Sequence, residues 1–336
     1  MAKKPTIGDL LDKYEPVLRD AFLASIDEIT SKVQIGRVIT ALERGDLQGA
    51  IDALYIDRAA YSTFERALEQ AYNDGGSATI NALGNLREPS GGTFVVRFDA
   101  RNPRAEQWLK EHSSNLVTRI VDDQKTAVRS ALVEGMSQGN NPRSTALDIV
   151  GRINRTTGKR EGGILGLSQP QEDAVRRARQ ELQDGRFNDF LQRARRDKRF
   201  DRTLLKALET GKPLTGEQIS KMVNRYSVSL LKLRGDTIGR TEALASLHAA
   251  QHESLKQLVD TGKIKASQIR RIWSSARDFR VRNAHRFADG QSVGFYETFD
   301  VGGRAMKYPG DPAGGPENTV NCRCVIIPRI DFLSNL

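Results

Sequence analysis

The sequence predicts an α+β protein, a mainly α-helical chain with a small mixed α+β C-terminal module. Before Gly262, apolar residues recur at three- and four-residue steps, which is the spacing of one helix face. From Gly290 to Pro316, glycine and proline become frequent and only short apolar stretches lie between them. This composition is typical of short strands joined by turns. No internal repeat is visible.

Residues 1–88 are expected to form an N-terminal helical region. Apolar runs with helical spacing lie around Leu18, Leu42 and Leu68. The start of the chain is basic but has no apolar run after it, so a secretory signal peptide is not expected. No stretch approaches the roughly 20 apolar residues that a membrane-spanning helix needs. We therefore expect a cytoplasmic compartment during synthesis and no membrane partner.

Residues 89–213 are expected to form a helical middle region. The Pro and Gly residues of 87–93 break regular structure, and we place a domain boundary or hinge there. Residues 94–98 have the composition of a short strand. Pro103 then fits the first turn of a helix whose periodicity continues to Met136. Within this region, residues 151–202 differ from the rest because they are crowded with arginine.

The basic segment 151–202 is a candidate nucleic-acid interface. The whole chain carries a net charge of +10 with a pI near 9.7, which favours nucleic acid or acidic proteins as partners, or serves solubility alone. Phe187, Phe190 and Phe200 are interleaved with the charges; cations neutralise phosphates and rings stack on bases. The alternative is a solvated helical face whose apolar residues pack inward. The candidate residues are Arg176, Arg177, Arg179, Arg193, Arg195, Arg196, Lys198, Arg199 and Arg202.

Residues 214–330 are expected to form the C-terminal domain, followed by a tail at 331–336. Residues 214–259 have the periodicity of two long helices separated at Gly235. After Gly262, residues 269–273 alternate apolar and charged side chains as a strand does, and residues 295–299 and 324–327 are further strand candidates.

Cys322 and Cys324 are the two cysteines of the chain. They should be thiols in a reducing compartment, and a disulfide across so short a loop would be strained. Because side chains alternate along a strand, both sulfurs should lie on one side of an extended segment. His285 is the natural third ligand of a zinc site, although the spacing is tighter than in common zinc sites. Possible fourth ligands are His248, His252, Asp278 and Asp289. The alternative is that both cysteines simply pack as small apolar groups.

A second polar set is expected to be structural. These residues, which could form a buried ion-pair network with Glu242 held by Arg240 or Arg282, are Arg240, Glu242, Asp278, Arg280 and Arg282. The sequence has no nucleophile–base pair, phosphate-binding glycine loop or zinc-protease motif, so no enzyme is expected. The enzyme alternative is a metal-dependent nuclease or toxin-like enzyme that uses His285 with Asn318 or Asn321. A DNA-binding regulator would need a recognition helix, and no such motif is present.

Four motifs in the C-terminal region occur together in a characteristic order. An Arg-Thr-Glu sequence lies in residues 238–243, and residues 278–285 read Asp-Phe-Arg-Val-Arg-Asn-Ala-His. Tyr-Pro-Gly-Asp-Pro follows at 308–312, and Asn-Cys-Arg-Cys at 321–324 closes the set. In this order the chain, over residues 214–330, resembles the phage Mu F-like head-morphogenesis family. It departs from the family at Gly239, where relatives usually have Ala.

The resemblance implies a minor head component of a tailed bacteriophage. Such a protein is present in few copies in the virion, at the portal vertex or in the capsid interior, and acts in head assembly or on packaged DNA. The partners implied are portal, capsid or scaffold proteins and double-stranded DNA. The basic segment 151–202 is compatible with such a role.

Overall fold

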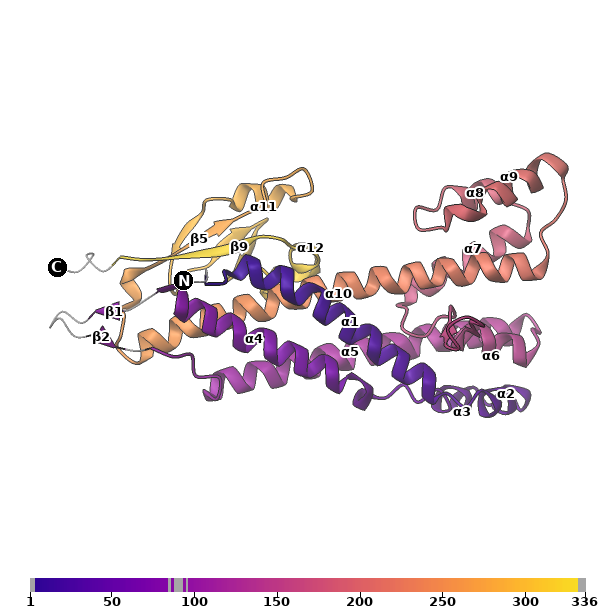
Figure 1. Ribbon diagram of the computed structural model, residues 1–336, viewed down its shortest axis with the longest axis horizontal. Coiled ribbons are helices and arrows are strands. Elements are labelled where there is room, and N and C mark those ends of the chain that lie inside the picture. The colour runs from indigo at the N-terminus through magenta and orange to yellow at the C-terminus, as the bar shows by residue number, and fades with distance from the viewer. Residues whose placement is uncertain (1–3, 84–85, 88–92, 95, 332–336) are drawn as a thin grey trace. The chain divides into compact units, whose positions relative to one another are not determined.

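The computed structural model describes residues 4–83, 86–87, 93–94 and 96–331 (Figure 1). The predicted fold class is confirmed, because helices dominate the chain and the strands are short and antiparallel. The residues group into two compact units. Unit 1 takes its described residues from Met1–Phe22, Thr63–Ser114 and Asp236–Leu336, and unit 2 from Leu23–Ser62 and Asn115–Gly235. The domain boundaries predicted near residues 88 and 213 stay predictions.

Four long helices supply most of the helical part of unit 1, and each of them also contributes residues to unit 2. These helices are α1 (Ile7–Lys32), α4 (Ser62–Leu83), α5 (Pro103–Ser137) and α10 (Gly216–Asp260). Helix α1 approaches α10 closely at Gly239. A Cβ atom placed on Gly239 would lie 2.5 Å from the carbonyl oxygen of Glu15 and 2.8 Å from the amide nitrogen of Arg19. The departure from Ala at this position therefore has a steric cause, since only glycine leaves room for the α1 backbone.

Helix α10 corrects one prediction. The sequence suggested two helices separated at Gly235, but one helix of 45 residues runs from Gly216 to Asp260. A glycine inside a helix costs only about 1 kcal/mol relative to alanine, which packing on either side of it offsets. The division between the two units nevertheless falls directly after Gly235.

The C-terminal module is built on a three-stranded antiparallel sheet (Figure 1). Strand β5 (Ile269–Ser274) lies in the centre, between β6 (Ser292–Gly294) and β9 (Val325–Ile330). A separate hairpin pairs β7 (Phe299–Val301) with β8 (Arg304–Met306). Two short helices, α11 (Asn283–Ala288) and α12 (Gly315–Thr319), complete the module.

The strand predictions of the module are partly confirmed. Residues 269–273 lie in β5, and most of residues 324–327 lie in β9. The prediction for residues 295–299 is wrong except at Phe299. The amide of Glu297 donates to the carbonyl of Gly294 at 3.3 Å, so the chain turns there before β7 begins.

The strand prediction for residues 94–98 is also mostly wrong. Only Phe94 is paired, in the hairpin of β1 (Leu86–Arg87) and β2 (Thr93–Phe94). Residues 96–98 are not in a strand, and residue 95 lies outside the described residues. Val96 and Phe98 instead pack against a core cluster formed by α4, α10 and the sheet.

That core cluster joins the sheet to the helices of unit 1. Its buried members are Ile80, Leu255, Leu258, Ile264, Ile269 and Phe295. Next to it, Arg271 of β5 is 2 % exposed, and its guanidinium donates to the carbonyls of Lys307 at 2.7 Å, Gly294 at 3.0 Å and Glu297. Burial lowers the pKa of Arg271 to about 10. The guanidinium is therefore still charged at neutral pH, and the three carbonyls stabilise that charge.

Unit 2 contains the remaining helices and one short hairpin. Its helices are α2 (Ile35–Glu43), α3 (Leu47–Asp52), α6 (Pro142–Val150), α7 (Gln169–Gln183), α8 (Phe187–Leu191) and α9 (Asp201–Thr210). Strands β3 (Arg152–Ile153) and β4 (Arg160–Glu161) form its hairpin. The chain also has short 3-10 helices at Arg58–Tyr61, Lys198–Phe200, Ala266–Gln268 and Pro312–Gly314. Among the described residues, no helix is both long and apolar enough to span a membrane.

Candidate functional sites

The first candidate site begins where the chain leaves α12 and enters β9. Asn321 takes a left-handed conformation with φ of 55°, and its amide donates to Thr241 Oγ1 at 3.1 Å. Residues 322–324 lie between α12 and β9, and both cysteine sulfurs lie close to His285, whereas the Arg323 side chain lies against Asp278. There the Arg323 guanidinium makes two hydrogen bonds of 2.6 Å to the carboxylate of Asp278.

His285 of α11 completes the cysteine pair. Its Nδ1 atom lies 3.3 Å from Cys324 Sγ and 3.4 Å from Cys322 Sγ. The three candidate ligand atoms all lie within 4.8 Å of one another, and each of the three residues is 2 % exposed. The structure therefore brings together the three residues that the sequence singled out, although 37 residues separate His285 from Cys322.

The two thiols of this cluster are not equivalent. The hydrogen bond with Cys324 lowers the pKa of Cys322 well below that of an ordinary thiol, against the opposing effect of burial, and His285 lowers it further. The pKa of Cys324 is raised, first by its hydrogen bond with Cys322 and then by burial. In addition, the amide of Cys324 donates to Cys322 Sγ at 3.4 Å. Cys322 is thus the thiol that ionises first.

None of the four suggested fourth ligands joins this cluster among the described residues. His248 Nδ1 lies 3.0 Å from the carbonyl of Leu244, and its Nε2 accepts from the amide of Ile326. Burial is the main reason that the pKa of His248 is lowered to about 4. The ring of His252 stacks on Phe295, with centroids 5.0 Å apart.

The two carboxylates suggested as fourth ligands also have other partners. Asp278 is held by Arg323, as described above, and its pKa is lowered chiefly by those hydrogen bonds. Asp289 accepts from the amide of Ser275 at 2.8 Å and from Arg277 Nε at 3.1 Å. The protein ligands that the cluster offers are therefore one imidazole and two sulfurs.

The predicted polar network is divided among separate contacts. Arg240 pairs with Glu15 at 3.0 Å, and Glu242 bonds to His112 at 2.7 Å. Arg240 and Glu242 cannot pair with each other in the way proposed, because residues two apart on a helix do not face each other. Arg282 donates to the carbonyl of Val320, and Arg280 lies 3.7 Å from Asp278.

The residues named for a nuclease alternative have structural contacts. Asn318 is buried, and its amide donates to the carbonyls of Val301 at 3.2 Å and Gly314 at 3.1 Å. The Asn321 side chain lies 3.5 Å from Thr237 Oγ1. Both asparagines therefore make structural contacts within the C-terminal module and α10.

The predicted basic residues of segment 151–202 fall into two groups. Five of them form ion pairs with nearby acids: Arg176 with Asp173, Arg179 with Asp148, Arg193 with Glu181, Arg196 with Asp201 and Arg199 with Asp197. Four are exposed and form no ion pair within the described chain: Arg177, Arg195, Lys198 and Arg202. Phe187 and Phe190 are buried, so they pack inward rather than presenting their rings to a ligand.

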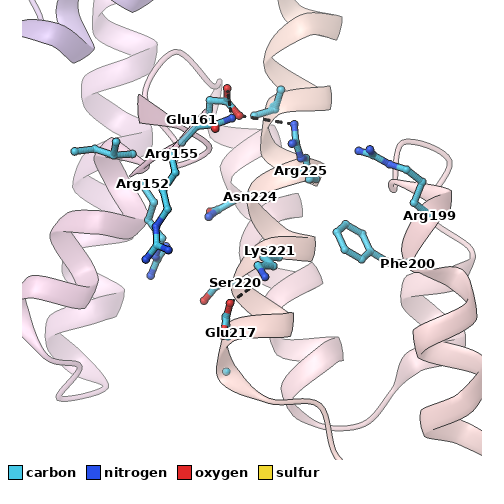
Figure 2. A pocket seen from close by; sticks show the side chains of 14 residues that line it. Arg152, Arg155, Glu161, Arg199, Phe200, Glu217, Ser220, Lys221, Asn224 and Arg225 are labelled. Atoms are coloured by element: carbon cyan, nitrogen blue, oxygen red, sulfur yellow. Dashed lines mark hydrogen bonds and ion pairs between the residues drawn. The ribbon is translucent and has the colours of Figure 1, made fainter. Parts of the chain in front are cut away.

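The second candidate site is an open basic pocket in unit 2 with a volume of about 840 Å³ (Figure 2). The β3–β4 hairpin supplies one side of it, helix α10 another, and the 3-10 helix Lys198–Phe200 a third. Its charged lining residues are five basic ones, Arg152, Arg155, Arg199, Lys221 and Arg225, and two acidic ones, Glu161 and Glu217. Asn154, Ser220 and Asn224 add polar side chains.

Of these five cations, the sequence singled out Arg199 alone. Lys221 and Arg225 lie outside the segment 151–202, and their four-residue spacing, which places both on one face of α10, was the signal available. Arg155 forms no ion pair with another described residue, whereas Lys221 pairs with Glu217 at 2.9 Å and Arg225 lies 3.7 Å from Glu161. Arg152 and Arg199 pair with Asp148 and Asp197, so Arg155 is the one lining cation without an ion pair among the described residues.

Comparison with known proteins identifies the class of the C-terminal region. Residues 198–327 match the family described as "Phage Mu protein F like protein", which confirms the predicted resemblance. The match covers 130 of the 336 residues, which is less than half of the chain. The chain is also 34% identical over 100 residues to the "Uncharacterized protein YqbB" of Bacillus subtilis (strain 168). That alignment covers 29% of this chain and 31% of the relative, so it spans under a third of either protein. No solved structure matches the chain.

Proposed function

We propose that the chain is a minor capsid protein of a tailed bacteriophage that acts in head assembly near the portal. The observation that carries this proposal is the family match over residues 198–327, which includes all four motifs in their expected order. The residues of those motifs mostly make structural contacts, such as Asp278 with Arg323 and Asn318 with two carbonyls. A structural role in the virion fits these contacts better than catalysis does.

The basic pocket supports a second part of the proposal, which is contact with packaged double-stranded DNA. Five cations against two carboxylates line an open pocket, and arginine and lysine side chains neutralise phosphates with release of counterions. The neighbouring exposed cations Arg177, Arg195, Lys198 and Arg202 belong to the same unit and add to its positive charge. Such binding would depend on phosphates rather than on base sequence.

The location of the protein in assembled particles tests the head role. Labelled protein should co-purify with proheads and virions in low copy number and should lie inside the shell near the portal. Deletion of its gene should reduce the number of heads or their DNA content. Absence from particles, together with normal heads in the deletion, would overturn the proposal; turnover by the isolated protein would then favour the enzyme alternative.

Charge reversal tests the DNA contact. Arg155→Glu combined with Arg225→Glu should weaken binding to a duplex by roughly tenfold or more at low salt and should flatten the salt dependence, since each lost phosphate contact removes about 0.9 from its slope. Lys110→Glu combined with Lys125→Glu changes the net charge equally at exposed positions that do not line the pocket. Equal losses in both double variants would show that binding follows overall charge and that the pocket is not the contact site.

A further inference from the structure

We propose that His285, Cys322 and Cys324 bind one zinc ion that fastens helix α11 to the start of strand β9. The three ligand atoms lie within 4.8 Å of one another in a buried position of the C-terminal module. This site is separate from the basic pocket, because all three ligands belong to unit 1 and the residues that line the pocket belong to unit 2.

The donor set fits zinc by its chemistry. Two thiolates and one imidazole are ligands that zinc prefers, and they exclude calcium and magnesium, which take oxygen ligands. Two thiolates also balance the charge of a divalent ion, so the occupied site is neutral where it is buried. Without an ion, a thiolate at Cys322 is compensated by hydrogen bonds with the Cys324 thiol, the Cys324 amide and the His285 ring, and no cation side chain bonds to it among the described residues.

The spacing of the ligand atoms fits a tetrahedral ion. Zinc–sulfur and zinc–nitrogen bonds of about 2.3 and 2.1 Å place tetrahedral sulfur and nitrogen ligands about 3.6 Å apart. The Nδ1 atom of His285 lies 3.3 Å from one sulfur and 3.4 Å from the other, so the ligands need to move apart by only a few tenths of an ångström. The Arg323 side chain between the two cysteines is held by Asp278 through two hydrogen bonds of 2.6 Å, which fixes this part of the chain next to the cluster.

The fourth coordination position is left to a small ligand such as water. His248, His252, Asp278 and Asp289 are held by the contacts described above and do not reach the cluster. Three protein ligands and one exchangeable ligand are a known arrangement for zinc. The ion would join segments 37 residues apart in sequence, and it would therefore stabilise the folded module against the unfolded chain.

Metal analysis of the full-length protein tests the site. Protein produced with zinc in the medium and then dialysed against metal-free buffer should retain about one zinc per chain. Cys322→Ser, Cys324→Ser and His285→Gln should each lose most of it, whereas His112→Gln should keep it, because His112 bonds to Glu242 instead. Retention in the three cluster variants, or a metal-free wild-type protein, would overturn the proposal.

Two further measurements on the wild-type chain do not depend on the folding of variants. Cobalt added to metal-stripped protein should give the sulfur-to-cobalt charge-transfer absorption of two thiolates in a tetrahedral site. A thiol reagent should react slowly with the native protein and at least tenfold faster after a chelator has removed the ion. If the thiols react equally fast with and without the chelator and no charge-transfer band appears, the cluster binds no metal and the cysteines only pack in the core.

Discussion

The two compact units bury ionisable side chains whose pKa values are shifted in opposite directions. Unit 1 buries His248 and His252 as neutral bases, with their pKa values lowered to about 4 and about 3. Unit 2 buries Glu172, and burial raises the pKa of its carboxyl to about 7. Burial opposes charge in all three cases, but it shifts the pKa of a base down and that of an acid up. The two units should therefore respond to pH in opposite directions.

The units also differ in how they neutralise buried cations. In unit 2, Arg193 and Glu181 form a pair at 2.6 Å in which each side chain is largely buried. In unit 1, the buried Arg271 instead donates to backbone carbonyls. The number of arginines in a segment therefore overestimates its unpaired positive charge, because many of them form ion pairs with nearby acidic side chains.

Breaking the buried pair of unit 2 should have the largest effect. Arg193→Met leaves the Glu181 carboxylate buried without its cation and removes a contact to the Tyr226 hydroxyl. The free energy of unfolding should fall by about 3–5 kcal/mol, as it does when one partner of a buried ion pair is removed. Denaturant unfolding of the variant measures this. The double variant Arg193→Met with Glu181→Leu should recover much of the loss, and a single-variant loss below about 1 kcal/mol would show that solvent already screens the pair.

Titration of Glu172 should give a smaller effect with a defined direction. Its folded pKa of about 7 exceeds the ordinary value of 4.5, chiefly because of burial and then because of Asp173. The folded state therefore holds a proton that the unfolded state releases, and unit 2 should lose about 2 kcal/mol as pH rises from 4.5 to 7.

Hydrogen exchange of α7 amides across this pH range measures the effect, after correction for intrinsic exchange. Glu172→Gln keeps the shape of the side chain and should remove the dependence. A wild-type protection that stays flat between pH 4.5 and 7 would contradict the raised pKa.

Acidification should weaken unit 1 instead. The pKa of His252 is lowered first by burial and then by the nearby charges of Arg271, Lys307 and Lys256. Because the unfolded chain binds a proton below pH 6.5 and the folded chain does not, stability should fall by about 1 kcal/mol for each pH unit below 6.5. Exchange of amides in the last turns of α10, near His252, measures this loss. His252→Phe should reduce it, and equal pH dependence in the variant would assign the effect to other groups.

Part of the fold follows directly from local sequence patterns. The 3.6-residue periodicity indicated the helices, and the alternation of residues 269–273 indicated β5. Boundaries were less well predicted, since α10 continues through Gly235 and residues 295–298 turn rather than extend. In both places packing, which local propensity does not contain, determines the outcome.

The sequence by itself predicted that the sulfurs of Cys322 and Cys324 lie on one side, because strand alternation is a local property of the backbone, and both sulfurs do lie near His285. Only the tertiary structure decided that Glu242 meets His112, 130 residues away, and that Arg155 and Arg225 line one pocket. Side-chain partners distant in sequence depend on how helices and strands pack. Distant partners can be predicted from the sequence only where a known family motif contains both segments, as residues 278–285 and 321–324 do here.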